Sequence, residues 1–315
     1  MNGTVIKSTG SWYRVRMDGT NEIVEARILG KFRLQNLILT NPVAVGDVVT
    51  VRRDKNGDVL IQKIMPRRNY VARQSPRQMR NLHLLASNVD QTVLFTTIVE
   101  PDVKLGFIDR FLLMTEPQNI PTVVVFNKSD LYLADKQTKA FAREIQQIYK
   151  DIGYQTITFS ALDGTGHDEL KLALKDKITL LAGQSGVGKS SAVNAIESDL
   201  SLRTSEISEY SGKGQHTTTF AEMHPLSFGG YLIDTPGIKT LSFNNLTPLQ
   251  VAQNFREIFN LANQCKFGGT CLHQNEPNCA VKDAITGGGI SESRYDSFSQ
   301  ILQEVKDLNY WERHR

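Results

Sequence analysis

The sequence predicts a multidomain chain with an all-β barrel of the OB type at the N-terminus, a central α/β domain and a C-terminal α-helical domain. Three observations support this prediction. Five short segments with strand-like alternation come first, a glycine-rich loop between an apolar strand and a helix lies in the middle, and three cysteines with a histidine lie near the end. With 315 residues, of which 40% are apolar, the chain is long enough for two or three domains.

Residues 1–66 are predicted to form the OB-like barrel. Strands are expected over 4–7, 12–17, 22–28, 48–52 and 59–64, separated by glycine-containing turns. From residue 27 to residue 80 there are twelve Lys or Arg and three Asp, although the whole chain has a net charge of only +3. This local excess indicates a surface for an RNA backbone, and a solvated barrel face with a basic linker is the alternative. Trp12, Tyr13 and Phe32 could stack on bases or fill the barrel core.

A polar linker over 67–82 is expected to lead into the central domain, which is predicted to span 67–246. Apolar runs predict strands over 89–98, 122–126, 156–159, 178–181 and 231–233. Helical spacing of apolar residues predicts helices over 107–114, 141–148, 169–174 and 191–195. Strands that alternate with helices in this way predict a parallel sheet covered on both faces.

Residues 183–190 form a G-x-x-x-x-G-K-S phosphate loop between a strand and a helix. Glycines are expected there because backbone N–H groups must turn toward a polyphosphate and a Cβ would block its approach. Lys189 is expected to neutralise the outer phosphates and Ser190 to bind Mg²⁺, while the helix N-terminus adds positive charge. The nucleotide-binding residues expected in this loop are Gly183, Gln184, Ser185, Gly186, Val187, Gly188, Lys189, Ser190 and Ser191.

An N-K-x-D tetrad at 127–130 directly follows a buried strand and predicts a guanine site. Asp130 can accept hydrogen bonds from N1–H and N2–H₂ of guanine, a donor edge that adenine lacks. Asn127 is expected on the N7 and O6 side of the base, and the stem of Lys128 is expected along the ring and sugar.

A polar segment over 203–219 contains glycines and ends in threonines, as a switch loop that senses a γ-phosphate does. Thr217 and Thr218 are both candidate Mg²⁺ ligands, and we favour Thr218. Asp234 follows an apolar strand and begins a D-x-x-G element. It can hold the water shell of Mg²⁺, and the N–H of Gly237 can meet the γ-phosphate. The expected magnesium residues are Ser190, Thr218 and Asp234.

Together with Ser160 and Ala161 at the end of another strand, these elements resemble the five nucleotide-binding motifs of Ras-like GTPases. In those proteins the Ser-Ala pair lets a backbone N–H reach guanine O6, and both this pair and N-K-x-D come after the phosphate loop. Here both precede it, so the domain is expected to be a circularly permuted P-loop GTPase. Such a permutation is possible when the original termini lie close together at the surface.

The C-terminal domain, predicted over 247–315, holds Cys265, Cys271, His273 and Cys279 in the spacing C-x₅-C-x-H-x₅-C. Three thiolates and one imidazole match a closed structural zinc site, and buried cysteines beside an incidental histidine are the alternative. An odd, clustered set of cysteines favours metal in a reducing compartment over disulfides. One helix is expected from Thr247 to about residue 262 and another over 293–311.

With the barrel, the permuted GTPase and the Cys₃His finger in this order, nearly the whole chain resembles the YjeQ/RsgA-type small ribosomal subunit biogenesis GTPases. The resemblance implies an enzyme that the ribosome stimulates to hydrolyse GTP to GDP and phosphate. It also implies binding to the small subunit and its rRNA late in maturation, and release after hydrolysis. The family's finger has one residue fewer between its first two cysteines than this chain, a difference that the Gly268-Gly269 pair can absorb.

The catalytic residues expected are Lys189, Thr218 and His216. Ras-like enzymes place a water-orienting glutamine just after D-x-x-G. Ile238 stands at that position here and cannot orient water, so we assign this role to His216, as the resemblance also implies. An exposed structural histidine is the alternative.

Two other functions are weighed against the GTPase. An RNA-binding scaffold could hold GTP or GDP as a structural or switching ligand with little hydrolysis, but the set of phosphoryl-transfer residues is intact. An ATPase or kinase is disfavoured by Asp130. No apolar run approaches about 18 residues and no signal pattern opens the chain, so we expect a cytoplasmic monomer without membrane contact.

Overall fold

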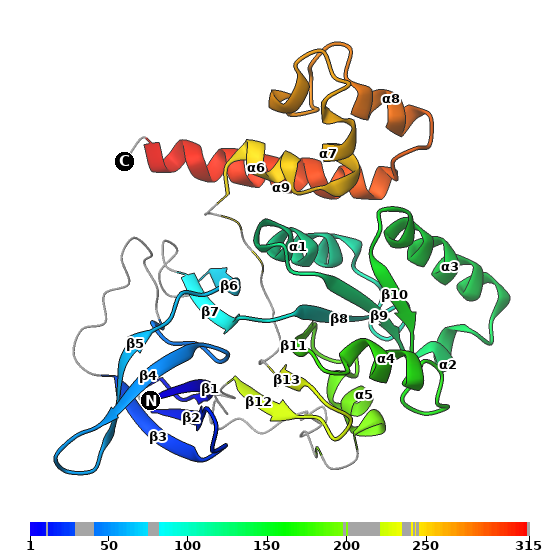
Figure 1. Cartoon of the computed structure of the whole chain (residues 1–315). Coiled ribbons are helices and arrows are strands. Elements are labelled where there is room, and N and C mark those ends of the chain that lie inside the picture. The colour runs from blue at the N-terminus through cyan, green and yellow to red at the C-terminus, as the bar shows by residue number, and fades with distance from the viewer. Residues whose placement is uncertain are drawn as a thin grey trace, which may run out of the picture.

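A computed structural model describes residues 1–10, 12–28, 41–74, 82–197, 200, 221–234, 241, 243 and 246–313 of the chain (Figure 1). Five strands form the N-terminal barrel, as predicted: β1 (Asn2–Ser8), β2 (Tyr13–Met17), β3 (Ile23–Ile28), β4 (Val48–Arg53) and β5 (Val59–Ile64). The order runs β1, β2, β3, β5, β4, and β4 pairs again with β1, so the barrel is closed. Val5 and Ile61 are fully buried in its core. Tyr13 lies in the core, Trp12 is 40% exposed, and Phe32 lies outside the described residues.

Five parallel strands form the central sheet, close to their predicted positions. They lie in the order β10 (Gln155–Thr158), β9 (Thr122–Asn127), β8 (Gln91–Thr97), β11 (Ile178–Gly183) and β13 (Tyr231–Asp234). β12 (Glu222–Pro225) was not predicted and pairs with β13 in the antiparallel direction. β12 is only four residues long and ends in proline, so it is too short for an alternation to identify it as a strand.

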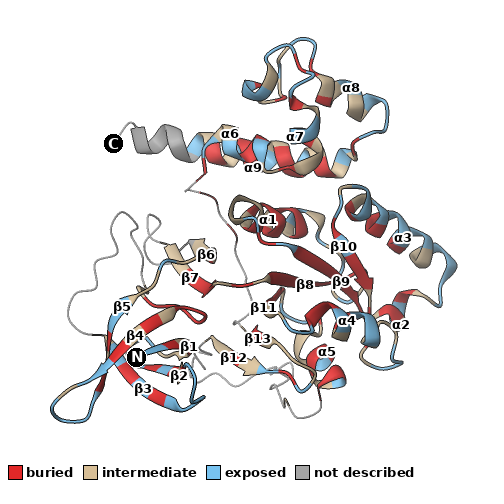
Figure 2. Ribbon diagram, viewed as in Figure 1, coloured by how far each residue is buried: buried red, intermediate tan, exposed pale blue. Residues whose placement is uncertain are grey.

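Helices cover both faces of this sheet, as strands buried on both sides require. They are α1 (Leu105–Thr115), η1 (Glu116–Gln118), α2 (Ser129–Tyr132), α3 (Lys136–Asp151), α4 (His167–Leu174) and α5 (Lys189–Ile196). Leu94 of β8 packs in the core under α1 and α3, and its neighbour Phe95 packs in the core under α4 and α5. Figure 2 shows this as nearly continuous burial along β8 and β9. Phe141, the first apolar residue of the helix predicted over 141–148, is 45% exposed.

A hairpin occupies much of the segment that was predicted to be a polar linker. β6 (Tyr70–Gln74) and β7 (Leu82–Ser87) pair with each other in the antiparallel direction. Val71 is fully buried there because Leu85 and Ala86 of β7 lie in the same core. Packing against the apolar residues of β7 therefore stabilises a strand at β6, although the sequence of this segment is mostly polar.

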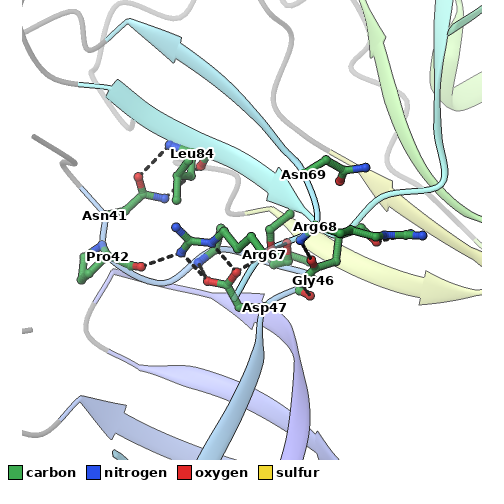
Figure 3. A network of polar contacts seen from close by, with 12 residues as sticks. Asn41, Pro42, Gly46, Asp47, Arg67, Arg68, Asn69 and Leu84 are labelled. Atoms are coloured by element: carbon green, nitrogen blue, oxygen red, sulfur yellow. Dashed lines mark hydrogen bonds and ion pairs between the residues drawn. The ribbon is translucent and has the colours of Figure 1, made fainter. Parts of the chain in front are cut away.

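A buried ion pair fixes the barrel against this hairpin (Figure 3). Asp47, which is fully buried, accepts from Nε of Arg67 at 2.6 Å and from its guanidinium Nη2 at 2.7 Å. The Ser87 hydroxyl of β7 donates to the same carboxylate at 2.6 Å. Arg67 is one of the twelve basic residues between positions 27 and 80, but its guanidinium group is bound to Asp47 inside the protein.

The barrel and the central sheet also join through their edge strands. β1 pairs with β12 in the antiparallel direction, with Lys7 opposite Glu222, and the two sheets form a single eleven-strand order. Figure 1 shows β12 lying between β13 and the barrel strands. The central domain and the barrel are thus connected by backbone hydrogen bonding as well as by side chains.

The C-terminal domain is helical: α6 (Pro248–Gln253), α7 (Arg256–Ala262), η2 (Gly268–Thr270), α8 (Ala280–Thr286) and α9 (Glu292–Arg313). Thr247 and Gln250 form a capping box at the start of α6, where the predicted helix begins. The single helix predicted up to residue 262 is broken into α6 and α7 at Asn254, and Phe255 is extended. None of the described helices combines the length and apolar character needed to cross a membrane.

A buried charge cluster attaches this domain to the central one. Arg294 of α9 is 2% exposed and donates to Asp109 of α1 and to Glu257 of α7, each at 2.7 Å. The hydroxyl of Tyr149 on α3 donates to the same Asp109 oxygen at 2.9 Å. The guanidinium group of Arg294 therefore joins α7 of the C-terminal domain to α1 of the central domain.

Candidate nucleotide-binding site and metal centre

The predicted nucleotide residues gather at one edge of the central sheet, where the parallel strands end. Asn127 ends β9, Gly183 ends β11 and Asp234 ends β13. Asp130 and Ser160 follow β9 and β10 within a few residues. Ligands of parallel sheets bind at this carboxyl edge, so the topology places the separated motifs around one site.

The phosphate loop has the backbone that its glycines were expected to permit. Gly183, Gly186 and Gly188 have φ values of 143°, 83° and 82°. A Cβ on Gly183 would lie 2.5 Å from the backbone oxygen of Phe95, and a Cβ on Gly188 would lie 2.5 Å from Nδ2 of Asn127. Both glycines are therefore required by backbone angle and by close packing.

Lys189 begins α5 and reaches back over the loop. Its Nζ donates to the backbone oxygens of Gly183 and Gln184, each at 2.9 Å. Burial lowers the pKa of Lys189, and the negative charge of Asp234 opposes this effect. The lysine of the phosphate loop and the aspartate of D-x-x-G are thus electrostatic neighbours. Around them, Val187 is buried while Ser185, Gly186 and Ser191 are exposed.

Asn127 connects the N-K-x-D turn to the phosphate loop. Its Nδ2 donates to the backbone oxygen of Val187 at 2.8 Å, which joins two segments 60 positions apart. The prediction placed this side chain on the base, and the structure shows that one of its donors is used inside the protein. Its Oδ1 is buried without a hydrogen-bond partner in the described part of the chain, so a bound donor would satisfy it.

The carboxylate of Asp130, which is predicted to read the base, is held by a serine. The Ser160 hydroxyl donates to Oδ1 of Asp130 at 2.6 Å, a contact that sequence reasoning missed because it assigned a backbone role to this residue and to Ala161. Ala161 lies at the edge of the core under α4 and α5. His167 was also missed, and its Nε2 bonds the backbone oxygen of Ser160 at 2.9 Å. Lys128, with φ of 59°, makes the turn that presents Asp130.

Two of the three expected magnesium residues are described. Ser190 is the second residue of α5, directly after Lys189, and Asp234 ends β13. A serine hydroxyl and a carboxylate are oxygen donors of the kind that Mg²⁺ prefers. Thr217, Thr218, His216 and Gly237 lie outside the described residues, so their expected roles remain predictions.

The cysteine and histidine residues of the C-terminal domain meet as predicted. The potential ligand atoms of Cys265, Cys271, His273 and Cys279 lie within 4.8 Å of one another, and all four residues are buried. Sγ of Cys265 is 3.9 Å from Sγ of Cys279 and 3.5 Å from Nδ1 of His273. Tetrahedral zinc with ligand bonds of about 2.0–2.3 Å requires similar separations, so the cluster fits a zinc site.

The surroundings of this cluster hold its loop in place. The Glu276 carboxylate accepts from the backbone N–H groups of Leu272 and Gln274 at 3.0 Å and 2.7 Å. The Tyr295 hydroxyl of α9 donates to the backbone oxygen of His273 at 2.6 Å. Gly268, with φ of 52° and open space around it, lets the longer spacing after Cys265 turn back toward the site.

Two protein-family models match this chain, one over the barrel and one over the central domain. The model of the RsgA N-terminal domain matches residues 2–61, and the model of the RsgA GTPase matches residues 64–244. A Flavobacterium psychrophilum protein named small ribosomal subunit biogenesis GTPase RsgA is 47% identical over 310 residues, covering 96% of this chain and 93% of that protein. The protein of the same name from Phocaeicola vulgatus is 43% identical and covers 98% and 99%.

Two solved structures match the whole architecture. The crystal structure of YjeQ from Thermotoga maritima matches with a TM-score of 0.77 and 36% identity, over 96% of this chain and 98% of that one. The crystal structure of YloQ, described as a circularly permuted GTPase, matches with a TM-score of 0.73 and 28% identity, over 97% and 95%.

Proposed function

Because the chain belongs to the RsgA family of small ribosomal subunit biogenesis GTPases, we propose that it hydrolyses GTP to GDP and phosphate in the late maturation of the small subunit. The observation that carries this proposal is the hydrogen bond from Asn127 to Val187, which unites the guanine-reading turn and the phosphate loop in one site. A scaffold without hydrolysis is not favoured, because the lysine, serine and aspartate used in phosphoryl transfer meet at the same sheet edge.

Base selection rests on Asp130. Its carboxylate can accept from N1–H and N2–H₂ of guanine, whereas adenine offers no such pair of donors. The Ser160 hydroxyl fixes one carboxylate oxygen and so orients the other for the base. Binding of ATP is disfavoured because adenine would leave the second oxygen of this carboxylate without the two donors that guanine offers.

Phosphate binding rests on the loop and on Lys189. The loop backbone N–H groups and the α5 N-terminus offer donors to the β-phosphate, and the ammonium group of Lys189 neutralises outer oxygens. Ser190 and Asp234 would hold Mg²⁺ with Thr218, and bound Mg²⁺ would supply charge stabilisation at the β- and γ-phosphates. His216 orients the attacking water in this proposal, since Ile238 cannot.

Binding to the small subunit and its rRNA rests on the barrel. Arg27 lies over the exposed ring of Trp12 with its guanidinium carbon 3.8 Å from the ring centre, and such exposed aromatic and cationic groups suit RNA. We further propose that the Cys₃His cluster binds one structural zinc ion and that the protein works in the cytoplasm with its ribosomal partner. The expectation of a monomer stays a prediction.

The experiment that tests the proposal is release of phosphate from GTP by the full chain, with and without purified small ribosomal subunits. We expect slow turnover alone and a rate at least about tenfold higher with small subunits. Large subunits are the control and should give the unstimulated rate. Tight GTP binding with equal slow turnover in all three conditions would support the scaffold instead.

A further inference from the structure

Three charged residues lie side by side across three neighbouring strands. Lys7 on β1 is the Cα partner of Glu222 on β12, and Glu222 is the Cα partner of Asp234 on β13. β1 belongs to the barrel, and Asp234 ends the strand that enters the D-x-x-G element. One row of the sheet therefore runs from the barrel to the magnesium aspartate.

The side chains of this row lie on the same face of the sheet, because directly opposed residues in paired strands project to the same side. Leu232, two residues before Asp234, packs in the core with Ala192 and Val193 of α5. The row therefore lies on the face covered by α5, the helix that begins with the lysine of the phosphate loop. This is the face on which a bound nucleotide and its Mg²⁺ are expected.

The row brings two carboxylates together. Directly opposed residues have Cβ atoms about 4.5–5.5 Å apart, and like charges in this arrangement repel each other. Nζ of Lys7 lies 2.6 Å from Oε2 of Glu222, and each side chain is 29% exposed. Lys7 thus holds and neutralises the carboxylate that neighbours Asp234.

We propose that Lys7 is a positioning residue of the GTP site, contributed by the barrel, that acts through Glu222 on the surroundings of Asp234. With Lys7 present, Glu222 is neutralised and directed toward the barrel, and the charge beside Asp234 suits a Mg²⁺-bound triphosphate. Without it, Glu222 adds a negative charge that opposes the γ-phosphate. This inference rests on the proposed function, since it assigns the site to GTP.

The test compares the wild type with Lys7→Met, Glu222→Gln and the double variant. Met keeps most of the aliphatic stem of Lys7, and Gln keeps the shape of Glu222, so both remove charge with little change in packing. Affinities for GDP and for a non-hydrolysable GTP analogue are measured at fixed Mg²⁺, and melting temperatures are recorded for each protein.

We expect Lys7→Met to weaken binding of the GTP analogue by about three- to fivefold, an effect limited by solvent screening. GDP binding should change less because GDP lacks the γ-phosphate. Adding Glu222→Gln should restore the affinity, since it removes the charge that Lys7 no longer neutralises. Lys7→Arg should bind the analogue like the wild type.

Arg16→Met is the matched control. The Arg16 guanidinium lies over the ring of Tyr231 on β13, with its carbon 4.4 Å from the ring centre. Tyr231 and Asp234 are three positions apart and so lie on opposite faces of β13. This variant removes a barrel cation that contacts the same strand, and it should bind both nucleotides like the wild type.

The proposal is overturned if Lys7→Met and the double variant bind the analogue as the wild type does, or if both lose affinity equally for GDP and the analogue. A structural role alone would give the second pattern together with a lower melting temperature. Failure of the wild type to bind either guanine nucleotide would contradict the proposed function itself, which separates the two outcomes.

Discussion

The side-chain Nδ2 of Asn127 donates to the backbone oxygen of Val187 at 2.8 Å and lies so close to Gly188 that a Cβ added there would be 2.5 Å from it. This contact joins the two segments that we propose read the base and bind the phosphates. In a permuted chain these segments come from strands far apart in sequence, so a bond between them fixes the distance between base and phosphates.

Gly188→Ala should disrupt this junction. A Cβ would lie 2.5 Å from Nδ2 of Asn127, and φ of 82° is unfavourable for alanine. The phosphate loop must then change its conformation to avoid this clash, and binding must restore the original conformation at a cost in free energy. We therefore expect guanine nucleotide affinity to fall about 30- to 100-fold, or ~2–3 kcal/mol. Equilibrium binding of fluorescent GDP measures this.

Gly57→Ala is the control for the backbone angle, since Gly57 has φ of 89° and nothing within 4 Å of an added Cβ. It should leave GDP affinity unchanged. Equal affinity of the Gly188 variant and the wild type would show that the loop tolerates a side chain there.

His216→Ala should bind GTP normally and lose most of the hydrolysis stimulated by small subunits, because the attacking water would lose the group that we propose orients it. His216→Gln should retain part of the rate, as an amide can also orient water. Single-turnover phosphate release gives both rates. A wild-type rate in the alanine variant would remove His216 from the mechanism.

Cys271→Ser should lower the zinc content from about one ion per chain and destabilise the C-terminal domain, since a structural zinc site contributes directly to folding. Burial raises the pKa of the Cys271 thiol to about 12, so a thiolate there needs a cation. Elemental analysis and thermal melting with and without a chelator are the measurements. Thr270→Ala in the same loop is the control, and wild-type chain without zinc would contradict the assignment.

Arg294→Met should destabilise the protein by about 3–5 kcal/mol, because Asp109 and Glu257 would be left without their partner in a buried place. Arg53→Met removes the exposed pair with Glu22 and should cost less than about 1 kcal/mol. Denaturant unfolding measures both. Similar small losses in the two variants would mean that the carboxylates become solvated or protonated.

The elements around the site could be predicted because their signals are local. An apolar strand followed by Gly183 to Lys189, or by Asn127 to Asp130, identifies both a strand end and a loop, and the structure has them there. The break between α6 and α7 was missed because Val251, Phe255 and Ile258 keep helical spacing across it, although Phe255 is extended.

The contacts between distant segments could not be predicted. The Lys7 and Glu222 side chains meet across 215 positions, and β12 lacks the apolar pattern that would have identified it as a strand. The burial of Arg294 could not be predicted either. Its charge suggests a solvated helix face, but the residue is only 2% exposed. Such pairs depend on the order of strands and the docking of helices, which no short motif encodes.

The most direct measurement is phosphate release by Asp130→Asn with small ribosomal subunits, using GTP and xanthosine triphosphate. Xanthine has an oxygen where guanine has N2–H₂, so an amide at position 130 suits it better than a carboxylate does. We expect the wild type to use GTP and the variant to lose GTP turnover and gain stimulated turnover of xanthosine triphosphate. Unchanged use of GTP by the variant would contradict a guanine site built around Asp130.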